Sequence, residues 1–266
     1  MRLLYENRSV QDQKFIRKVC NYILDQPIEE KEKSDQFCGI YVEGRDRDIN
    51  TSEDFASLYS FKCFSRYDYP IYVFCRSNKN WMNGDFATIS RVNFIQIPPL
   101  NSLDEYTNFC TKELYHKISK DIKYAVTLQP DAALLRNGWE DEFLKNNWVY
   151  LGSPWTHAPS IEYQDNDGEW KDFLGPVRVG NGGFSIRDVN FCRAASIYYG
   201  NYKLREKFAP NNKIPPEDLF YSTIAKYLDG NMPTVEQASQ FCCDPLTPEI
   251  FNSNNKPFGF HYYSSG

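Results

Sequence analysis

Hydrophobic residues recur at helical spacing near the start of the chain. From Phe15 to Leu24 they return at steps of three and four residues, which predicts a helix with one apolar face. Ser9 is a suitable N-cap. Pro27 should end the helix, because proline disfavours helical backbone in the residue before it. We therefore expect residues 1–35 to form a helical extension.

Short apolar runs then alternate with helical patterns as far as residue 128. Strands are expected at residues 37–42, 71–74, 93–97 and 123–128. One helix should begin at Thr51, and another at Ser102, which forms a capping box with Glu105. Strands that alternate with helices indicate βαβ units and a largely parallel sheet. Ligands of such sheets bind beyond the carboxyl ends of the strands, which are here the turn at 43–48 and the segment 129–131.

Beyond about residue 150 the chain is richer in glycine, proline and aromatic residues, joined by short helical patterns. No linker separates this part from the preceding one. The pattern therefore predicts a single α/β domain over residues 36–266.

Composition and charge narrow the function classes. The chain has 266 residues, 41% of them hydrophobic and 24% charged, values that are ordinary for a globular protein with a full core. Its 30 basic and 35 acidic residues give a net charge of −5, which argues against binding nucleic acid, since such proteins neutralise phosphates with a basic surface. Nucleic acid is therefore excluded as a partner.

Compartment is argued from three expected absences. No apolar run reaches the roughly 18–20 residues that would cross a bilayer, and the first residues lack the apolar stretch of an export signal. The eight cysteines contain no Cys-x-x-Cys pair, so we expect reduced, mostly buried thiols in a cytoplasmic protein. A peripheral contact with a membrane is compatible with these features.

Gln129 and Asp131 follow the last of the predicted strands. Because they lie two residues apart at a strand end, their side chains should share one face. A carboxylate there can hold a hard divalent cation against a diphosphate. A turn that merely ends the strand explains the Pro-Asp pair equally well.

A second candidate is the glycine-rich run from Gly180 to Arg187. Its glycines around Asn181 allow the backbone to approach a ligand closely and to expose amide groups. The spacing fits neither the phosphate-binding loop nor the dinucleotide fingerprint. A tight hairpin explains the glycines nearly as well.

Acidic residues and histidines complete the set. Pro216 should be the first residue of a helix that carries Glu217 and Asp218 in its first turn and ends before Gly230. These acids either complement the helix dipole, worth about 0.3–1 kcal/mol, or provide an ionised carboxylate that accepts a proton. The local sequence does not separate these two readings.

The three histidines differ in setting. His116 lies in a helical pattern and should be a surface or packing residue, whereas His261 follows a Phe-Gly-Phe segment near the end of the chain. An isolated histidine is usually structural, but an imidazole beside a carboxylate would suit Mn²⁺.

Taken in order, these motifs resemble a known family. The segments that carry the resemblance are 129–131, 139–144, 150–155, 180–187, 216–218, 241–244 and 258–261. They resemble a family of bacterial and viral glycosyltransferase-like proteins, catalogued largely as a domain of unknown function. The resemblance covers residues 36–263, and its strongest motifs are the glycine run, Pro-Glu-Asp and Phe-Gly-Phe-His.

The resemblance implies a GT-A-type, Rossmann-like fold: three layers around a mostly parallel mixed sheet. It also implies a nucleotide-diphosphate sugar as donor and Mn²⁺ or Mg²⁺ as cofactor. Asp131 stands where the last acid of an Asp-x-Asp motif binds the metal, and Gln129 replaces the first acid. His261 matches a histidine that completes the coordination, and the nucleotide should contact the loop at 43–47, chiefly Glu43 and Arg45.

Similarity to galactosyltransferase-like enzymes implies the remaining roles. Asp218 would be the catalytic base and Glu217 would orient the acceptor or sugar, although the two roles could be exchanged. The turn at Gly182 and Gly183 would shape the acceptor site, with Asn181 beside it. Among the aromatic residues, Trp155 is the best-placed candidate for stacking on a sugar.

The predicted function is a metal-dependent, inverting glycosyltransferase acting on a glycan or glycoconjugate, as in polysaccharide biosynthesis. Three alternatives stay open: a metal-dependent hydrolase of nucleotide sugars, a retaining enzyme, and a non-catalytic glycan- or nucleotide-binding module. The last is motivated by Gln129, because a neutral amide weakens a metal site.

Overall fold

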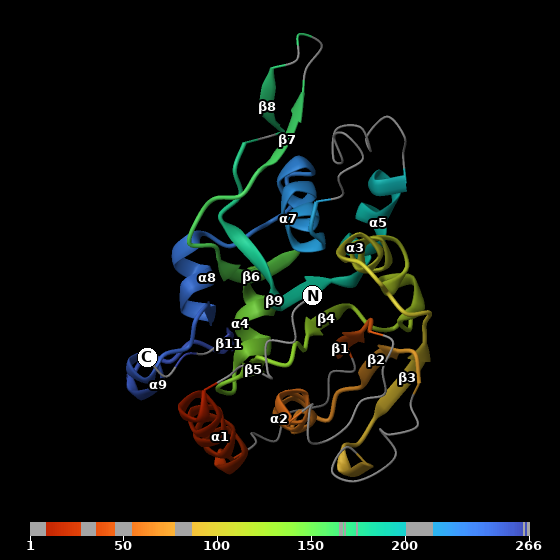
Figure 1. The fold of residues 1–266 in the computed structure, drawn as a ribbon. Helices are drawn as coiled ribbons and strands as arrows, with labels where there is room; N and C mark the ends of the chain where they lie inside the picture. The colour runs from red at the N-terminus through yellow and green to blue at the C-terminus, as the bar shows by residue number, and fades with distance from the viewer. Residues whose placement is uncertain are drawn as a thin grey trace.

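A six-stranded sheet forms the centre of the structure (Figure 1). The computed structural model describes residues 9–27, 36–45, 55–77, 87–164, 167, 169–173, 175–200, 215–262 and 264. Its strands are β1 (Phe37–Glu43), β2 (Ile71–Cys75), β3 (Val92–Gln96), β4 (Tyr124–Thr127), β5 (Ala132–Leu134), β6 (Tyr150–Pro154), β7 (Ile161–Gln164), β8 (Trp170–Phe173), β9 (Val179–Asp188), β10 (Cys242–Cys243) and β11 (Gly259–His261). Its helices are α1 (Val10–Asp25), α2 (Phe55–Ser65), α3 (Leu103–Lys112), the 3₁₀ helix η2 (Leu114–Lys117), α4 (Trp139–Asn146), α5 (Val189–Gly200), α7 (Glu217–Tyr227), α8 (Val235–Phe241) and α9 (Pro248–Asn252).

The strand order in the central sheet is β3-β2-β1-β4-β9-β6. β1 pairs in parallel with β2 and β4, and β2 pairs in parallel with β3. β9 runs antiparallel to both of its neighbours, β4 and β6, so the other five strands share one direction. The prediction of an α/β fold with a mostly parallel mixed sheet is confirmed.

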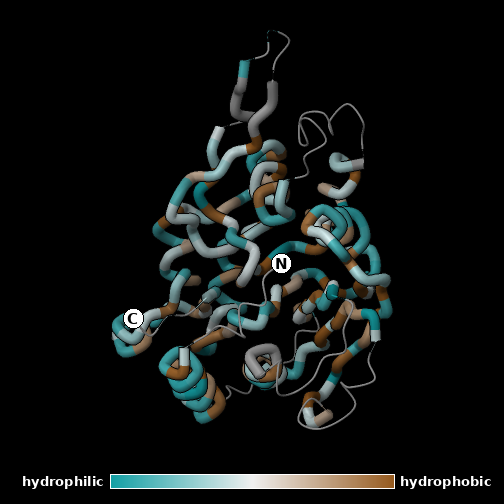
Figure 2. The backbone as a smooth tube through the Cα atoms, in the orientation of Figure 1, coloured by the Kyte–Doolittle hydropathy of each residue, from teal (hydrophilic) through white to brown (hydrophobic). Residues whose placement is uncertain are grey.

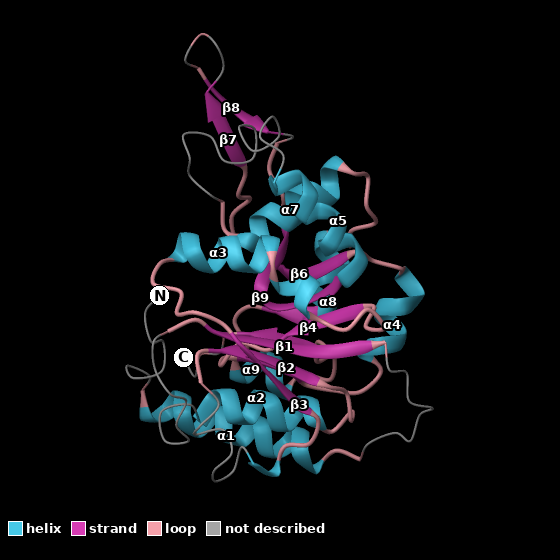
Figure 3. Ribbon diagram, turned by 90° about the vertical axis from the view of Figure 1, so that its right-hand side faces the viewer, coloured by secondary structure: helices cyan, strands magenta, loops and turns pink. Residues whose placement is uncertain are grey.

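Helices cover both faces of this sheet, so that the domain has three layers. Figure 3 shows α3, α5 and α7 over one face and α2 against the other. Two apolar clusters fill the spaces between: one joins the sheet to α3, α5 and α7, and the other joins it to α2, α4 and α8. In Figure 2 hydrophobic residues run along the strands, whereas hydrophilic and hydrophobic residues alternate around α1, as expected of a helix that buries one side.

The N-terminal helix α1 packs onto the domain. Ser9 caps it by accepting a hydrogen bond from the backbone N–H of Asp12 at 3.0 Å, and Gln26 is the C-cap, so the predicted helix is confirmed. The buried residues of α1 form one apolar cluster with Phe251 and Phe260. Arg66 donates to the carbonyl oxygens of Ile23 and Gln26 and so closes the last turn. Because residues 28–35 lie outside the described residues, a domain boundary at residue 35 stays a prediction.

Most of the predicted elements form where the pattern placed them. α3 begins after Ser102 as predicted, but it ends at Lys112, so His116, which was expected in a helical pattern, lies on the 3₁₀ helix η2, where its Nε2 is 3.0 Å from Ser196 Oγ. The Ser102 hydroxyl caps α3, but the Glu105 carboxylate accepts from Asn101 instead of Ser102, so the predicted capping box is incomplete. Thr51 and residues 46–48 lie outside the described residues.

None of the eight cysteines, all of which lie within the described residues, forms a disulfide, and seven of them are buried, as expected of mostly buried thiols. Within the described ranges, no helix is both long and apolar enough to cross a membrane.

Candidate functional site

Strand direction brings three distant segments to one edge of the sheet. β4 is antiparallel to β9 and pairs with its last residues, Ile186 to Asp188, so the first part of β9 extends beyond the carboxyl end of β4. The first turn of α7 meets the same part of β9, where Gly182 N–H donates to Asp218 Oδ2 at 3.1 Å. The predicted groups therefore converge at the carboxyl edge, where ligands of such sheets bind.

Asp131 lies in a turn just beyond β4. That strand ends at Thr127, and the backbone N–H of Ala132 donates to the carbonyl of Gln129 at 3.1 Å, which closes the turn. Gln129 and Asp131 are therefore not part of the strand, and the expectation that they share a strand face was wrong. The Asp131 side chain is buried, and Gln129 is half-buried.

His261 reaches Asp131 through a small second sheet. β11 runs antiparallel to β5, with His261 opposite Ala132. His261 Nε2 lies 3.7 Å from Asp131 Oδ1, and its Nδ1 lies 3.3 Å from Asp244 Oδ2. Burial lowers the pKa of His261, but the hydrogen bond to Asp244 and the charges of Asp131 and Asp244 outweigh burial and raise it above its ordinary value.

The glycine run is part of a continuous strand. Residues 179–188 form β9, so the hairpin interpretation was wrong. Successive residues of a strand face opposite sides, and the two neighbouring glycines show this. A Cβ at Gly182 would lie 2.8 Å from Glu217 Oε1, whereas a Cβ at Gly183 would overlap the ring of His261. Both sides of the strand are thus packed too closely for a side chain.

The first turn of α7 holds the two acids differently. Pro216 is the N-cap, so the helix begins at Glu217, one residue later than predicted. Asp218 is half-buried, and its carboxylate accepts from the backbone N–H groups of Gly182 and Leu219 at 3.1 and 2.8 Å. Glu217 is buried. Burial raises its pKa, and the charge of Asp218 raises it further, while Arg187 acts in the opposite direction.

Arg187 is the counter-ion of Glu217, with Nη2 3.3 Å from Glu217 Oε1. Its guanidinium lies 4.8 Å from the centre of the Tyr150 ring and also donates to Tyr115 and Ser185. Sequence reasoning assigned no role to Arg187. The signal available was an arginine directly after the apolar residues of a strand, since a charge that is buried in a protein is retained there only when it is paired.

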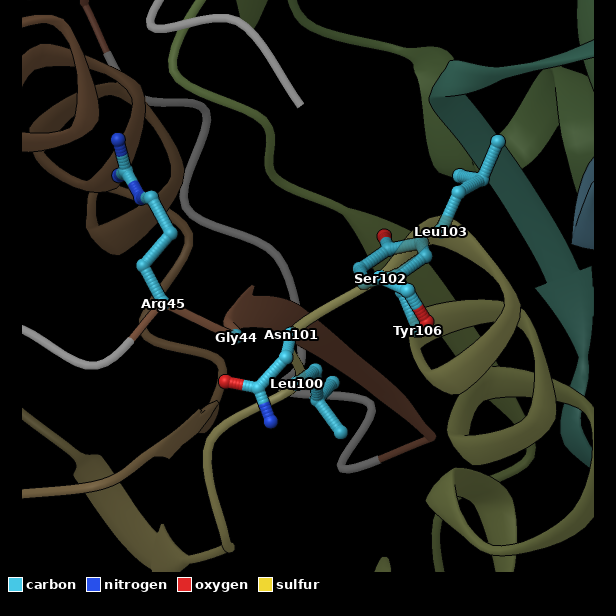
Figure 4. A pocket seen from close by; sticks show the side chains of 7 residues that line it. All are labelled: Gly44, Arg45, Leu100, Asn101, Ser102, Leu103 and Tyr106. Carbon is cyan, nitrogen blue, oxygen red and sulfur yellow. The ribbon is translucent and has the colours of Figure 1, made fainter.

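A pocket lies at the carboxyl end of β1. Its volume is about 270 Å³. Figure 4 shows the residues that line it, between the end of β1 and the first turn of α3. Its lining residues are Gly44, Arg45, Leu100, Asn101, Ser102, Leu103 and Tyr106. Glu43 is buried at the base of this segment and accepts from Arg45 Nε at 2.6 Å. Burial raises the pKa of Tyr106, one of the lining residues, well above its ordinary value.

The other predicted substrate residues lie on the same edge. Asn181 opposes Ser153 of β6, and its amide donates to Asp244 Oδ2 at 2.7 Å while its Oδ1 accepts from Gly183 N–H at 3.2 Å. Trp155 follows β6 directly, is half-buried, and donates its backbone N–H to the carbonyl of Arg178 at 3.0 Å. Their roles toward a substrate stay predictions.

The close contact at Gly183 gives the first testable prediction. Gly183→Ala should shift the ring of His261 and destabilise the protein by about 1–3 kcal/mol, because an added methyl group overpacks the site. Urea denaturation and the imidazole NMR signals of His261 would measure both effects. Gly39→Ala is the control, since its Cβ would lie 2.6 Å from Leu128 Cδ1 and so would overpack the core without contacting His261; it should leave the His261 signals unchanged. Unchanged His261 signals in Gly183→Ala would contradict the packing described here.

The chain belongs to a catalogued protein family. Residues 89–261 match the model of a family described as "Protein of unknown function (DUF5672)". This range is narrower than the 36–263 over which the resemblance was expected. No curated protein sequence matches the chain significantly.

The solved structures to which the chain is similar include two proteins from other sources. Mouse xyloside xylosyltransferase 1, in its apo form, is 8% identical, with 85% of this chain and 96% of that chain covered and a TM-score of 0.47. The 4-diphosphocytidyl-2C-methyl-D-erythritol synthase of Anaerococcus prevotii is 11% identical, with 73% and 97% covered and a TM-score of 0.38. Structural similarities this low do not indicate which reaction the chain catalyses.

Proposed function

We propose that this chain is a metal-dependent, inverting glycosyltransferase of the GT-A type. It moves a sugar from a nucleotide-diphosphate donor to a hydroxyl of a glycan or glycoconjugate. The observation that carries the proposal is the convergence of Asp131, His261 and Asp218 around two successive glycines at the carboxyl edge of the sheet. These groups are far apart in sequence, and such an edge is where α/β sheets bind ligands.

The pocket beside β1 would receive the nucleoside part of the donor. At about 270 Å³ it is just below the roughly 300–1,000 Å³ of pockets that enclose whole ligands, so it suits one part of a larger molecule. Tyr106 offers an aromatic wall, and Arg45 and Asn101 offer polar groups. β1 lies next to β4 in the sheet, so a diphosphate leaving this pocket would extend toward Asp131.

Asp131 and His261 would hold the cation. Among the residues that the structure describes, no three His, Cys, Asp or Glu side chains are grouped so as to hold a metal on their own. Two protein ligands nevertheless fit a site that the donor completes, since Mg²⁺-type ions commonly take one or two protein groups, phosphate oxygens and water. When bound, the ion would neutralise the charge that develops on the leaving diphosphate.

Asp218 is the better placed of the two acids to accept a proton. It is half-buried, and two backbone N–H groups hold its carboxylate in place at the start of α7. The acceptor oxygen would bond to the anomeric carbon as the bond to the phosphate oxygen breaks, and its proton would pass to Asp218. A single displacement of this kind inverts the anomeric configuration. Glu217 is buried against Arg187 and would orient the acceptor or the sugar instead.

A donor panel tests the proposal. The purified protein would be incubated with Mn²⁺, a range of nucleotide-diphosphate sugars and oligosaccharide acceptors, and the products and their anomeric configuration followed by NMR. Transfer with inversion is the expected result. Release of free sugar as the main product would indicate a hydrolase, and retained configuration a retaining enzyme. Binding of a donor without turnover would indicate a binding module.

A further inference from the structure

Asp244 joins two parts of the site that are distant in sequence. Its Oδ2 atom accepts from Asn181 Nδ2 at 2.7 Å and lies 3.3 Å from His261 Nδ1. Asn181 in turn holds the N–H of Gly183, the residue packed against the His261 ring. One carboxylate oxygen therefore contacts both the strand that carries the glycines and the strand that carries the histidine.

The second sheet explains why Asp244 lies beside His261. β10 and β11 are parallel, with Cys243 opposite Phe260, so the residues that follow, Asp244 and His261, are neighbours across the pair. The backbone N–H of Leu246 donates to the carbonyl of Tyr262 at 2.9 Å and continues the pairing. This backbone frame holds the carboxylate at the Nδ1 side of the ring.

A carboxylate at Nδ1 determines how the other ring nitrogen is presented. In a neutral imidazole one nitrogen carries the proton and the other accepts, and the hydrogen bond at one nitrogen sets the state of the other. With Nδ1–H donating to Asp244, Nε2 carries a lone pair. This lone pair faces Asp131 Oδ1 at 3.7 Å, a distance too long for a hydrogen bond and suited to two groups that bind one ion.

We propose that Asp244 is a positioning residue, which fixes the tautomer and the orientation of His261 so that Nε2 can ligate a divalent cation together with Asp131. This inference rests on the proposed function. Histidines that bind metals usually donate their other N–H to a carboxylate or carbonyl, and loss of that partner typically weakens metal affinity by about 10–100-fold. Neither the glycine run nor the Phe-Gly-Phe-His motif reveals this partner, because it comes from a third segment.

The tautomer of His261 can be measured in the metal-free protein. The chain has only three histidines, so ¹⁵N-detected imidazole spectra of wild type, His116→Gln and His157→Gln assign the His261 signals. At a pH where the rings are neutral, we expect the His261 proton on Nδ1. A histidine without such a partner carries its proton mainly on Nε2, so a wild-type proton on Nε2 would overturn the proposal even if every Asp244 variant failed to fold.

Two substitutions separate positioning from simple packing. Asp244→Ala removes the acceptor, and we expect the proton to move to Nε2 and the affinity for Mn²⁺ alone, titrated by electron paramagnetic resonance, to fall by about 10–100-fold. Asp244→Asn keeps an oxygen acceptor and should restore the wild-type tautomer. Equal Mn²⁺ affinity and an unchanged tautomer in Asp244→Ala would overturn the proposal.

The tautomer also separates this inference from the proposed function. A proton on Nδ1 in a protein that turns over no donor supports the positioning by Asp244 and counts against the enzyme. A proton on Nε2 in a protein that transfers sugar supports the enzyme and contradicts the positioning by Asp244.

Discussion

Asp218→Asn should lower the rate of sugar transfer by about 10²–10⁴-fold, the usual contribution of a positioned general base. The amide cannot accept the acceptor's proton, and its NH₂ group would face one of the two backbone N–H groups that the carboxylate now binds. Loss of one such hydrogen bond costs about 1 kcal/mol, so the variant should stay folded. The measurement is kcat with the donor and acceptor identified by the panel, alongside a urea denaturation curve.

Two comparisons make this result specific. Asp25→Asn changes an exposed carboxylate at the end of α1 and should leave kcat unchanged. Glu217→Gln should reduce kcat less than Asp218→Asn if the roles are as proposed, because Glu217 is paired with Arg187. Transfer by Asp218→Asn at close to the wild-type rate would eliminate Asp218 as the base, and a larger loss in Glu217→Gln would exchange the two roles.

Arg187→Met should destabilise the protein by about 3–5 kcal/mol, the cost of removing one partner from a buried ion pair. The substitution leaves Glu217 buried without its counter-ion and removes the donors to Tyr115 and Ser185. Methionine keeps much of the side-chain volume, so the loss comes mainly from charge and hydrogen bonding and less from a cavity. Urea denaturation at neutral pH measures it.

A double variant identifies the source of that loss. Arg187→Met with Glu217→Gln removes both charges, and it should be more stable than Arg187→Met alone, because no uncompensated carboxylate remains buried. If the two single losses simply add, the two side chains do not interact, and the ion pair at 3.3 Å is not the basis of the effect.

The fold was largely predictable because each element carries its own local signal. Ser9 caps α1 through a hydrogen bond from Asp12, which is only three residues away in sequence. The apolar runs of β1 and β2 are buried on both faces, as parallel strands require. The end of α3 was not predictable in this way. The apolar spacing continues through Leu114 and Ile118, which are buried, but the chain reaches these positions through a 3₁₀ turn that has a similar period.

The site was predictable only in part. Asp131, Asp218 and His261 belong to recognisable motifs, and the structure places them at one edge. Asp244 and Arg187 also lie in motif segments, 241–244 and 180–187, but they act through contacts with residues 17 and 30 positions away in sequence, and no local pattern indicates such contacts. The pocket was not predictable from a local pattern either, since its wall combines the end of β1 with the segment that leads into α3.

The strand pairing in the central sheet indicates that the matched region of the family does not fold on its own. The matched residues begin at 89, after β1 and β2, yet β3 pairs with β2 and β4 pairs with β1. A fragment cut to those residues would leave β3 separated from the rest of the sheet and would expose the open edge of β4 to solvent and to other chains. The unit that folds must therefore include the strands before the matched region, and fragments for expression or truncation should begin upstream of Phe37.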